Sequence, residues 1–196
     1  MKNIIIKTAL ITLGSVIALL VLAFGIASLA FPGNMAEICE NMGNPKLAAS
    51  YAERQYEYSG STEDLYRCTR LYIQTGDRTN TIKYCEELVE KPDFKKYCGN
   101  NVQYVYGNYA TALYLSDKKD ESIAIAEKSV EDGFSIPNAY ATLALQAVET
   151  EDKDFGESLL SSFLSKVEEP DPQNKDLYKY YNNITAILEN LTGDKK

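Results

Sequence analysis

The sequence predicts an all-α fold in which one long apolar helix precedes a series of paired amphipathic helices. An uncharged apolar run occupies most of the first roughly 30 residues, a length typical of a single long helix. After this run, apolar residues recur at spacings of three and four, the period of an amphipathic helix, with few alternating strand-like segments. Turn signals rich in Gly, Asp and Pro then interrupt the pattern at intervals of about 12 to 16 residues, an ordinary helix length.

The apolar run covers residues 8–31 and contains no charged side chain. As a helix, its core of roughly 23 residues would be about 35 Å long, enough to cross a hydrocarbon layer of about 30 Å. Pro32 and Gly33 are expected to end the helix. A cleaved secretory signal is the alternative, because Ser28-Leu29-Ala30 resembles a cleavage site. The run exceeds the core of about 7–15 residues that signals have, which favours an uncleaved transmembrane anchor.

Basic residues flank the apolar run on one side. Lys2 and Lys7 precede it, whereas the next Lys or Arg after it is Lys46. The positive-inside rule therefore predicts that residues 1–7 are cytoplasmic and that the domain at residues 32–192 is extracytoplasmic. We expect a single-pass protein of the cell membrane.

Composition excludes several classes of activity. The chain has 196 residues, a formal net charge of −8, and neither His nor Trp. The absence of His removes the usual acid–base group and the common partner of a nucleophile. An acidic chain is repelled by phosphate backbones, which argues against a nucleic-acid partner. Carboxylate pairs such as Glu86-Glu87 fall at expected helix ends and solvent faces, so we expect no enzyme, no metal site and no cofactor.

Turn signals divide the remaining chain into short helices. They lie at residues 43–45, 59–61, 75–77, 91–93, 116–117, 132–133, 151–152 and 169–172. Residues 91–96 are expected to form a longer connector. Pro45 suits the first turn of a helix, and Ser61 and Asp117 are expected to cap the helices that follow them.

Several segments repeat one order of residue types. Each has an aliphatic, aromatic or sulfur residue, a small residue, a larger residue three positions later, a polar turn and a small residue in the second helix. These second-helix residues are Ala48, Thr81, Ser122 and, in a weaker fourth copy, Ser158. They lie roughly 33, 41 and 36 residues apart, close to a period of about 34.

The second copy carries a resemblance to a known repeat. The matching residues are Leu65, Cys68, Tyr72, Gly76, Asp77, Thr81, Cys85, Leu88 and Pro92. With them, the chain from about Met35 to Val167 resembles tetratricopeptide-repeat (TPR-like) proteins, although no Trp opens a first helix. The resemblance implies an α-solenoid of about four helical hairpins, each burying its apolar stripe against the next. Related helical-hairpin repeats fit the same pattern.

One further amphipathic helix is expected at residues 176–191. It would act as a C-terminal capping helix that covers the exposed end of the last hairpin. Its apolar face comprises Leu177, Tyr181, Ile184, Leu188 and Leu191. Residues 193–196 are expected to form a polar tail.

The resemblance also implies a concave groove lined by the first helix of each hairpin. The residues expected there are Tyr66, Arg70, Gln74, Tyr104, Thr111, Tyr114 and Tyr140. Tyrosine provides contact area and a hydroxyl group at low entropic cost, which suits peptide recognition. The alternative is that a solvated helical surface simply tolerates them. Tyr51, Tyr72, Tyr84 and Tyr109 are expected in the core.

Cys39, Cys68, Cys85 and Cys98 form an even set in a domain expected outside the cytoplasm, where disulfides persist. Cys85 and Cys98 lie at similar distances from the turn at Pro92, and Cys39 and Cys68 lie on successive first helices, which gives one consistent pairing. Cys68 with Cys85 is a competing pair. Four free thiols buried in the core are the alternative.

These features favour a membrane-anchored, extracytoplasmic scaffold or assembly factor for protein–protein interaction, without catalysis. Its partner would be a protein or peptide at the membrane, where anchoring raises the effective concentration. A cell-surface binding module for a peptide or glycan ligand is the alternative. A secreted protein with a cleaved signal is a second alternative. The sequence does not specify the oligomeric state.

Overall fold

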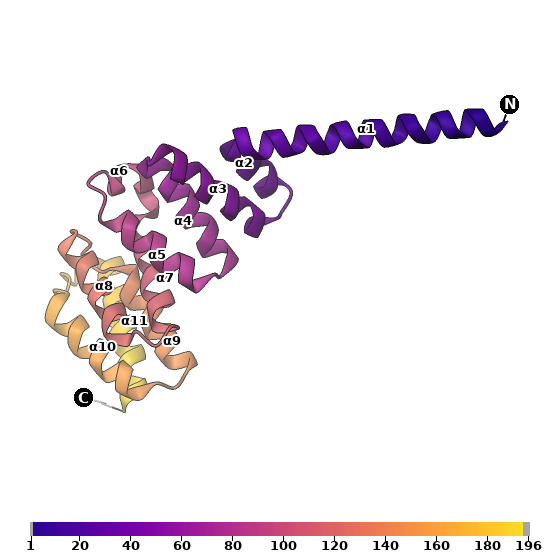
Figure 1. The fold of residues 1–196 in the computed structure, drawn as a ribbon. Coiled ribbons are helices and arrows are strands. Elements are labelled where there is room, and N and C mark those ends of the chain that lie inside the picture. Colours follow the sequence, from indigo (N-terminus) through magenta and orange to yellow (C-terminus); the bar gives the residue numbers. More distant parts are fainter. Residues whose placement is uncertain (1, 194–196) are drawn as a thin grey trace. The chain divides into compact units, whose positions relative to one another are not determined.

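A computed structural model describes residues 2–193, and all regular structure in that range is helical. The all-α class is therefore confirmed for the described residues, whereas positions 194–196 of the expected tail lie outside them. The helices are α1 (Lys2–Ala30), α2 (Pro32–Asn41), α3 (Pro45–Ser59), α4 (Thr62–Thr75), α5 (Arg78–Val89), α6 (Phe94–Cys98), the 3-10 helix η1 (Gly99–Asn101), α7 (Val102–Tyr114), α8 (Lys119–Glu131), α9 (Asn138–Glu149), α10 (Lys153–Lys166) and α11 (Lys175–Thr192) (Figure 1).

The N-terminal helix α1 is long, apolar and largely uncovered. Leu10–Ala30, a stretch of 21 residues near the N-terminus, is long and apolar enough to cross a membrane by length and composition. This part of the sequence prediction is confirmed. The helix ends at Ala30 as expected, but Pro32 does more than stop it: Pro32 occupies the first turn of α2, where its missing N–H group costs nothing.

The chain divides into two compact units, and the boundary lies within α4, between Leu71 and Tyr72. The first unit contains α1, α2, α3 and most of α4. In it, α2 and α3 form a tightly packed hairpin. Ala36 in α2 and Ala48, Ala49 and Ala52 in α3 are at most 1% exposed, so small side chains allow the two backbones to approach closely.

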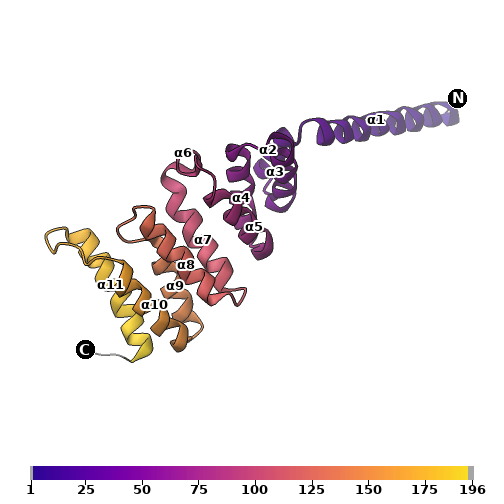
Figure 2. The ribbon, with the colours of Figure 1, turned by 60° about the vertical axis from the view of Figure 1, so that its left-hand side comes forward.

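The second unit is a succession of packed helices. α5 packs on α7, α7 packs on both α8 and α9, and α9 packs on both α10 and α11. α8 also packs on α10. Figure 2 shows α7 to α11 following one another in this order. The hairpin α7–α8 thus contacts the hairpin α9–α10 through both first helices and through both second helices, whereas α5 contacts α7.

Polar contacts between successive hairpins of the second unit recur at nearly constant sequence separation. Arg78 Nη1 donates to Leu115 O at 3.0 Å, across 37 residues. Asn138 N donates to Gln103 Oε1 at 2.6 Å, across 35 residues. Other contacts in the range of 35 to 38 residues are Lys95–Asp132, Lys128–Glu90, Tyr114–Thr150, Tyr114–Asp152 and Ser162–Glu127. These bonds join helices of one hairpin to helices or turns of the next.

The expected core residues are mostly buried. Tyr72, Tyr84 and Tyr109 are 7% or less exposed, whereas Tyr51 is only half-buried. The terminal helix α11 buries Tyr181, Ile184 and Leu188, as its apolar pattern predicts. Leu177 at its start remains exposed.

Helix caps follow the sequence signals with one exception. Ser61 Oγ accepts a hydrogen bond from Asp64 N at 3.1 Å, so its predicted capping role is confirmed. Asp117 does not cap α8, because its φ of 61° places it in the left-handed region and Lys118 occupies the N-cap position. Two other aspartates are caps: Asp77 caps α5 and Asp152 caps α10, and each side chain accepts a hydrogen bond from the backbone N–H three residues later.

Candidate partner-binding surface

Two of the seven expected groove residues lie in the core. Tyr140 is fully buried and Tyr114 is 6% exposed, so the prediction that they line an open surface is wrong. Both tyrosine side chains point between packed helices, where each ring contacts the ring of a phenylalanine. Tyr114 lies against Phe155 at 4.6 Å between ring centroids, and Tyr140 lies edge-on to Phe163 at 5.2 Å.

The hydroxyl groups of these tyrosines have partners inside the second unit. The Tyr140 hydroxyl lies 2.7 Å from Ser162 Oγ, and burial raises the pKa of Tyr140 to about 12. The Tyr114 hydroxyl lies 2.5 Å from Thr150 Oγ1 and donates to Asp152 Oδ2 at 3.1 Å. Tyr114 therefore joins α7 to the next hairpin, whereas Tyr140 joins the two helices α9 and α10 of its own hairpin.

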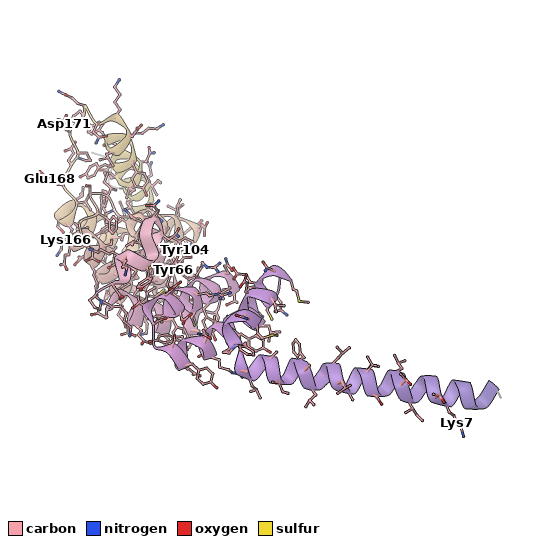
Figure 3. The ribbon with its side chains drawn as sticks, turned by 90° about the horizontal axis from the view of Figure 1, so that it is seen from above. Lys7, Tyr66, Tyr104, Lys166, Glu168 and Asp171 are labelled. Carbon is pink, nitrogen blue, oxygen red and sulfur yellow. The ribbon has the colours of Figure 1, made fainter. Side chains whose placement is uncertain are left out.

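The remaining expected groove residues are distributed over both units. Tyr66 and Arg70 lie in the first unit and are half-buried, and Arg70 Nη2 forms an ion pair with Glu40 Oε1 at 2.6 Å. Gln74, Tyr104 and Thr111 lie in the second unit. Figure 3 labels Tyr66 and Tyr104. Tyr104 is 41% exposed and Gln74 is exposed, so both are accessible to a partner.

Thr111 lines a small pocket of about 260 Å³. Its polar neighbours there are Arg78, Thr81 and Asn108, while Ile73, Ala112 and Leu115 provide the apolar part. Arg78 already donates to Leu115 O, so its guanidinium is held in place by the protein. Among the expected groove residues, Thr111 alone is placed in this pocket.

The four cysteines are free thiols, and all are buried. The expected disulfides are therefore absent, and the alternative of small core residues holds. Burial raises the pKa of Cys98 to about 12 and raises the pKa of Cys85 as well. The expected pairing of Cys85 with Cys98 assumed that Cys98 lies in a helix antiparallel to α5. Cys98 instead ends the separate short helix α6.

A larger cavity, which the sequence analysis missed, lies where two connectors of the second unit meet. Its volume is about 580 Å³. The loop between α8 and α9 contributes Gly133, Phe134 and Ser135, and the segment from α10 to α11 contributes most of the remainder. The full lining is Val130, Gly133, Phe134, Ser135, Lys166, Glu168, Glu169, Pro170, Asp171, Asn174 and Leu177. We call it the acidic cavity.

The acidic cavity combines an apolar part with a negatively charged rim. Glu168, Glu169 and Asp171 are exposed carboxylates on one side of it. Figure 3 shows Lys166, Glu168 and Asp171 along one edge of the second unit. Lys166 Nζ lies 3.4 Å from Glu127 Oε2, so the one ammonium group of the lining already has a carboxylate partner. The rim is therefore suited to a positively charged group.

Local backbone structure explains the placement of the rim. Val167 is buried and extended, which ends α10 and turns the chain outward. Asp171 Oδ1 then accepts from Gln173 N at 2.8 Å, a local turn that leads into α11. The sequence signals were the apolar Phe134 next to the turn at residues 132–133 and the Glu-Glu-Pro-Asp-Pro run, of which residues 169–172 were expected to form only a turn.

Within the described residues, no group of three or more Cys, Asp or Glu side chains is placed to hold a metal ion. Compared with known proteins, the chain matches no family model and no curated protein sequence. The proposals below therefore depend on the chain's own geometry and chemistry.

Proposed function

We propose that this chain is a membrane-anchored, extracytoplasmic scaffold that binds a protein partner and has no catalytic activity. One observation carries the proposal: an uncovered apolar helix long enough to cross a membrane precedes a chain of paired helices. Uncovered apolar surface on this scale is costly in water, so a lipid environment for α1 is the favourable solution. Lys2 and Lys7 before the span, and no Lys or Arg after it until Lys46, support this orientation.

The helix stack of the second unit supports a TPR-like arrangement. The hairpins α7–α8 and α9–α10 contact each other through equivalent helices, and polar contacts along the second unit recur at about 35 to 38 residues. Such stacks bury a continuous core between neighbours and leave extended surfaces free for partners. A short solenoid with α11 as its capping helix is the architecture that these features favour.

The acidic cavity is the proposed contact site for the partner. An apolar floor with a carboxylate rim suits a segment that presents an apolar side chain next to Lys or Arg, because charge complementarity then adds to apolar burial. Tyr104 and Gln74 are further accessible residues of the same unit. The partner is therefore proposed to be a basic segment of a protein at the same membrane.

A crosslinking capture from membranes tests the proposal. The full chain is expressed in its own membrane, crosslinked, and purified in detergent. Charge reversal of Glu168, Glu169 and Asp171 to Lys should abolish capture of the protein recovered with the unmodified chain. A matched control reverses three exposed carboxylates elsewhere: Glu57, Asp120 and Glu157. If the rim variant captures the partner as well as the control variant does, the cavity is rejected as the contact site.

Orientation has a separate test. Tyr58 is 72% exposed, whereas the native thiols are buried. Tyr58→Cys should therefore react in intact cells with a maleimide that cannot cross membranes. Labelling that appears only after cell lysis would place the domain in the cytoplasm.

A ligand-binding module for a peptide or glycan is the second candidate. The acidic cavity favours it, because about 580 Å³ lies within the range of about 300–1,000 Å³ of small-molecule sites. This alternative predicts a thermal shift with a small ligand and no co-purified protein. A secreted form with a cleaved signal predicts a mature mass clearly below the 21.9 kDa of the full chain.

A further inference from the structure

The C-terminal end of α1 is less exposed than the rest of the helix. Gly25, Ala27 and Ser28 are partly covered, whereas the residues of α1 described before them are exposed. α2 packs against α1, and Arg54 Nη1 of α3 donates to Ser28 O at 3.3 Å. The first hairpin therefore covers one side of α1 within the apolar stretch Leu10–Ala30.

This cover fixes a depth for the hairpin. The contacted residue Ser28 lies two positions before the end of the apolar stretch at Ala30, about 3 Å along the helix axis. The polar region on each side of a bilayer is about 5–7 Å thick. When α1 crosses a membrane, the part of the hairpin that contacts Ser28 lies at the boundary between the acyl chains and the lipid headgroups.

The first turn of α2, directly after α1, is bonded to both α3 and α4. Gly33 N donates to Gln55 Oε1 of α3 at 3.2 Å, and Arg67 Nη1 of α4 donates to Gly33 O at 3.2 Å. A Cβ atom at Gly33 would lie 3.1 Å from Gln55 Oε1, so glycine permits this close approach. These bonds fix the start of α2 within the first unit, and the bond from Arg54 Nη1 to Ser28 O joins the hairpin to α1 itself.

The turn between α2 and α3 carries an exposed apolar patch. Met42 at the turn is 78% exposed, Ile38 one helical turn earlier is 48% exposed, and Leu47 at the start of α3 is 42% exposed. Figures 1 and 3 both show this turn beside the apolar length of α1, and not beyond its end. We call Ile38, Met42 and Leu47 the turn patch.

Charges near the turn patch are compatible with a lipid surface. The Glu40 carboxylate pairs with Arg70 at 2.6 Å and with Arg67 at 3.9 Å, so it is neutralised. Glu37 and Lys46 are exposed charges of opposite sign and can stay in the headgroup layer. Because no cluster of basic residues is present, the patch matches a neutral or zwitterionic lipid surface better than a strongly anionic one.

We propose that the turn patch is a second membrane contact, inserted at the headgroup–acyl boundary of the leaflet in which α1 ends. The proposal rests on the proposed membrane insertion of α1 and adds a site and an orientation to it. The lipid is the occupant because the turn lies beside the apolar length of α1, so the membrane that surrounds α1 is the apolar phase at that level. Interfacial insertion of apolar side chains to about 5–10 Å is common for peripheral helices. The contact would hold the first hairpin at a fixed tilt to the membrane.

Tryptophan fluorescence tests the proposal cleanly, because the native chain contains no Trp. Three single variants of the full chain are reconstituted into phosphatidylcholine vesicles: Met42→Trp, Phe24→Trp and Tyr58→Trp. Phe24 reports on α1, and Tyr58 is an exposed control near the far end of α3. Lipids brominated near the glycerol backbone or near the chain end act as quenchers of different depth.

The expected result is quenching of Met42→Trp, strongest with bromine near the glycerol backbone, together with a shift of its emission to shorter wavelength. Phe24→Trp should also be quenched, and Tyr58→Trp should behave as it does in detergent. Quenching of Phe24→Trp without quenching of Met42→Trp would overturn the turn-patch contact while leaving the anchor in place. Absence of quenching at both positions would overturn the anchor and the turn-patch contact together.

Discussion

Lys119 Nζ at the start of α8 lies 2.7 Å from Asp152 Oδ2 in the turn between α9 and α10. The same carboxylate accepts from the Tyr114 hydroxyl of α7 at 3.1 Å, and Asp152 Oδ1 accepts from Phe155 N at 3.3 Å as the cap of α10. Asp152 therefore joins the hairpin α7–α8 to the hairpin α9–α10 and caps the first turn of α10.

Asp152→Ala should lower the free energy of unfolding by about 1–2 kcal/mol, because loss of a capping side chain alone costs about 0.5–2 kcal/mol. The exposed ion pair with Lys119 adds little to this value. Urea unfolding of the full chain in detergent measures the change. Glu157→Ala, an exposed position in the middle of α10, is the control and should stay within about 0.5 kcal/mol. Equal effects of the two substitutions would contradict the joining role of Asp152.

Acid should destabilise the second unit through Asp132 and Asp152. Burial alone would raise the pKa of each carboxyl, but hydrogen bonds from Tyr106 and Lys95 to Asp132, and from Lys119, Phe155 N and Tyr114 to Asp152, lower both pKa values overall. A depressed pKa in the folded state stabilises the fold above the ordinary aspartate pKa of about 3.9, and this stabilisation is lost as the pH falls below it.

The measurement is the unfolding free energy as a function of pH between neutral pH and about pH 3, the window set by these carboxyl groups. The double variant Asp132→Asn/Asp152→Asn should have a lower unfolding free energy than the unmodified chain at neutral pH. Its unfolding free energy should also decrease less when the pH is lowered. Asp120→Asn, at an exposed site, should leave the pH profile unchanged. A double variant with the full acid-dependent decrease would show that other groups control it.

The helical fold was predictable from the sequence because its signals are local. Spacings of three and four set the helices, and Gly60, Gly76 and Gly133 adopt positive φ at predicted turns. The candidate site was less predictable, because a helical pattern does not tell which aromatic residues face a neighbouring hairpin. Tyr114 and Tyr104 lie on the same helix, yet one is buried and the other exposed. The acidic cavity depends on two connectors far apart in sequence, whose proximity only the tertiary fold reveals.

The buried thiols should be unreactive in the folded protein. Burial raises the pKa of Cys85 and Cys98, so the reactive thiolate is scarce near neutral pH. A thiol reagent such as dithionitrobenzoate should react slowly with the native chain and with all four cysteines after denaturation. Reducing agent should not change the melting temperature. Non-reducing mass spectrometry that finds a mass loss corresponding to a disulfide would contradict this prediction.

Tyr140 and Tyr104, which the sequence placed in one groove, should respond differently to substitution. Tyr140 is fully buried in α9 and contacts Phe163, so Tyr140→Ala should cost about 3–5 kcal/mol of unfolding free energy through the cavity that it leaves. Tyr140→Phe keeps the ring but removes the hydroxyl that lies 2.7 Å from Ser162 Oγ, and should cost about 1 kcal/mol. Tyr104→Ala, at a 41% exposed site, should change stability by no more than about 0.5 kcal/mol.

Partner capture separates structure from binding at these positions. If Tyr104 contributes to recognition, Tyr104→Ala should weaken capture of the crosslinked partner while the melting temperature stays constant. Tyr140→Phe should leave capture intact, because the hydroxyl faces Ser162 inside the helix stack and is not accessible to a partner. Loss of capture in Tyr140→Phe without loss of stability would place Tyr140 in a binding surface and contradict its assignment to the core.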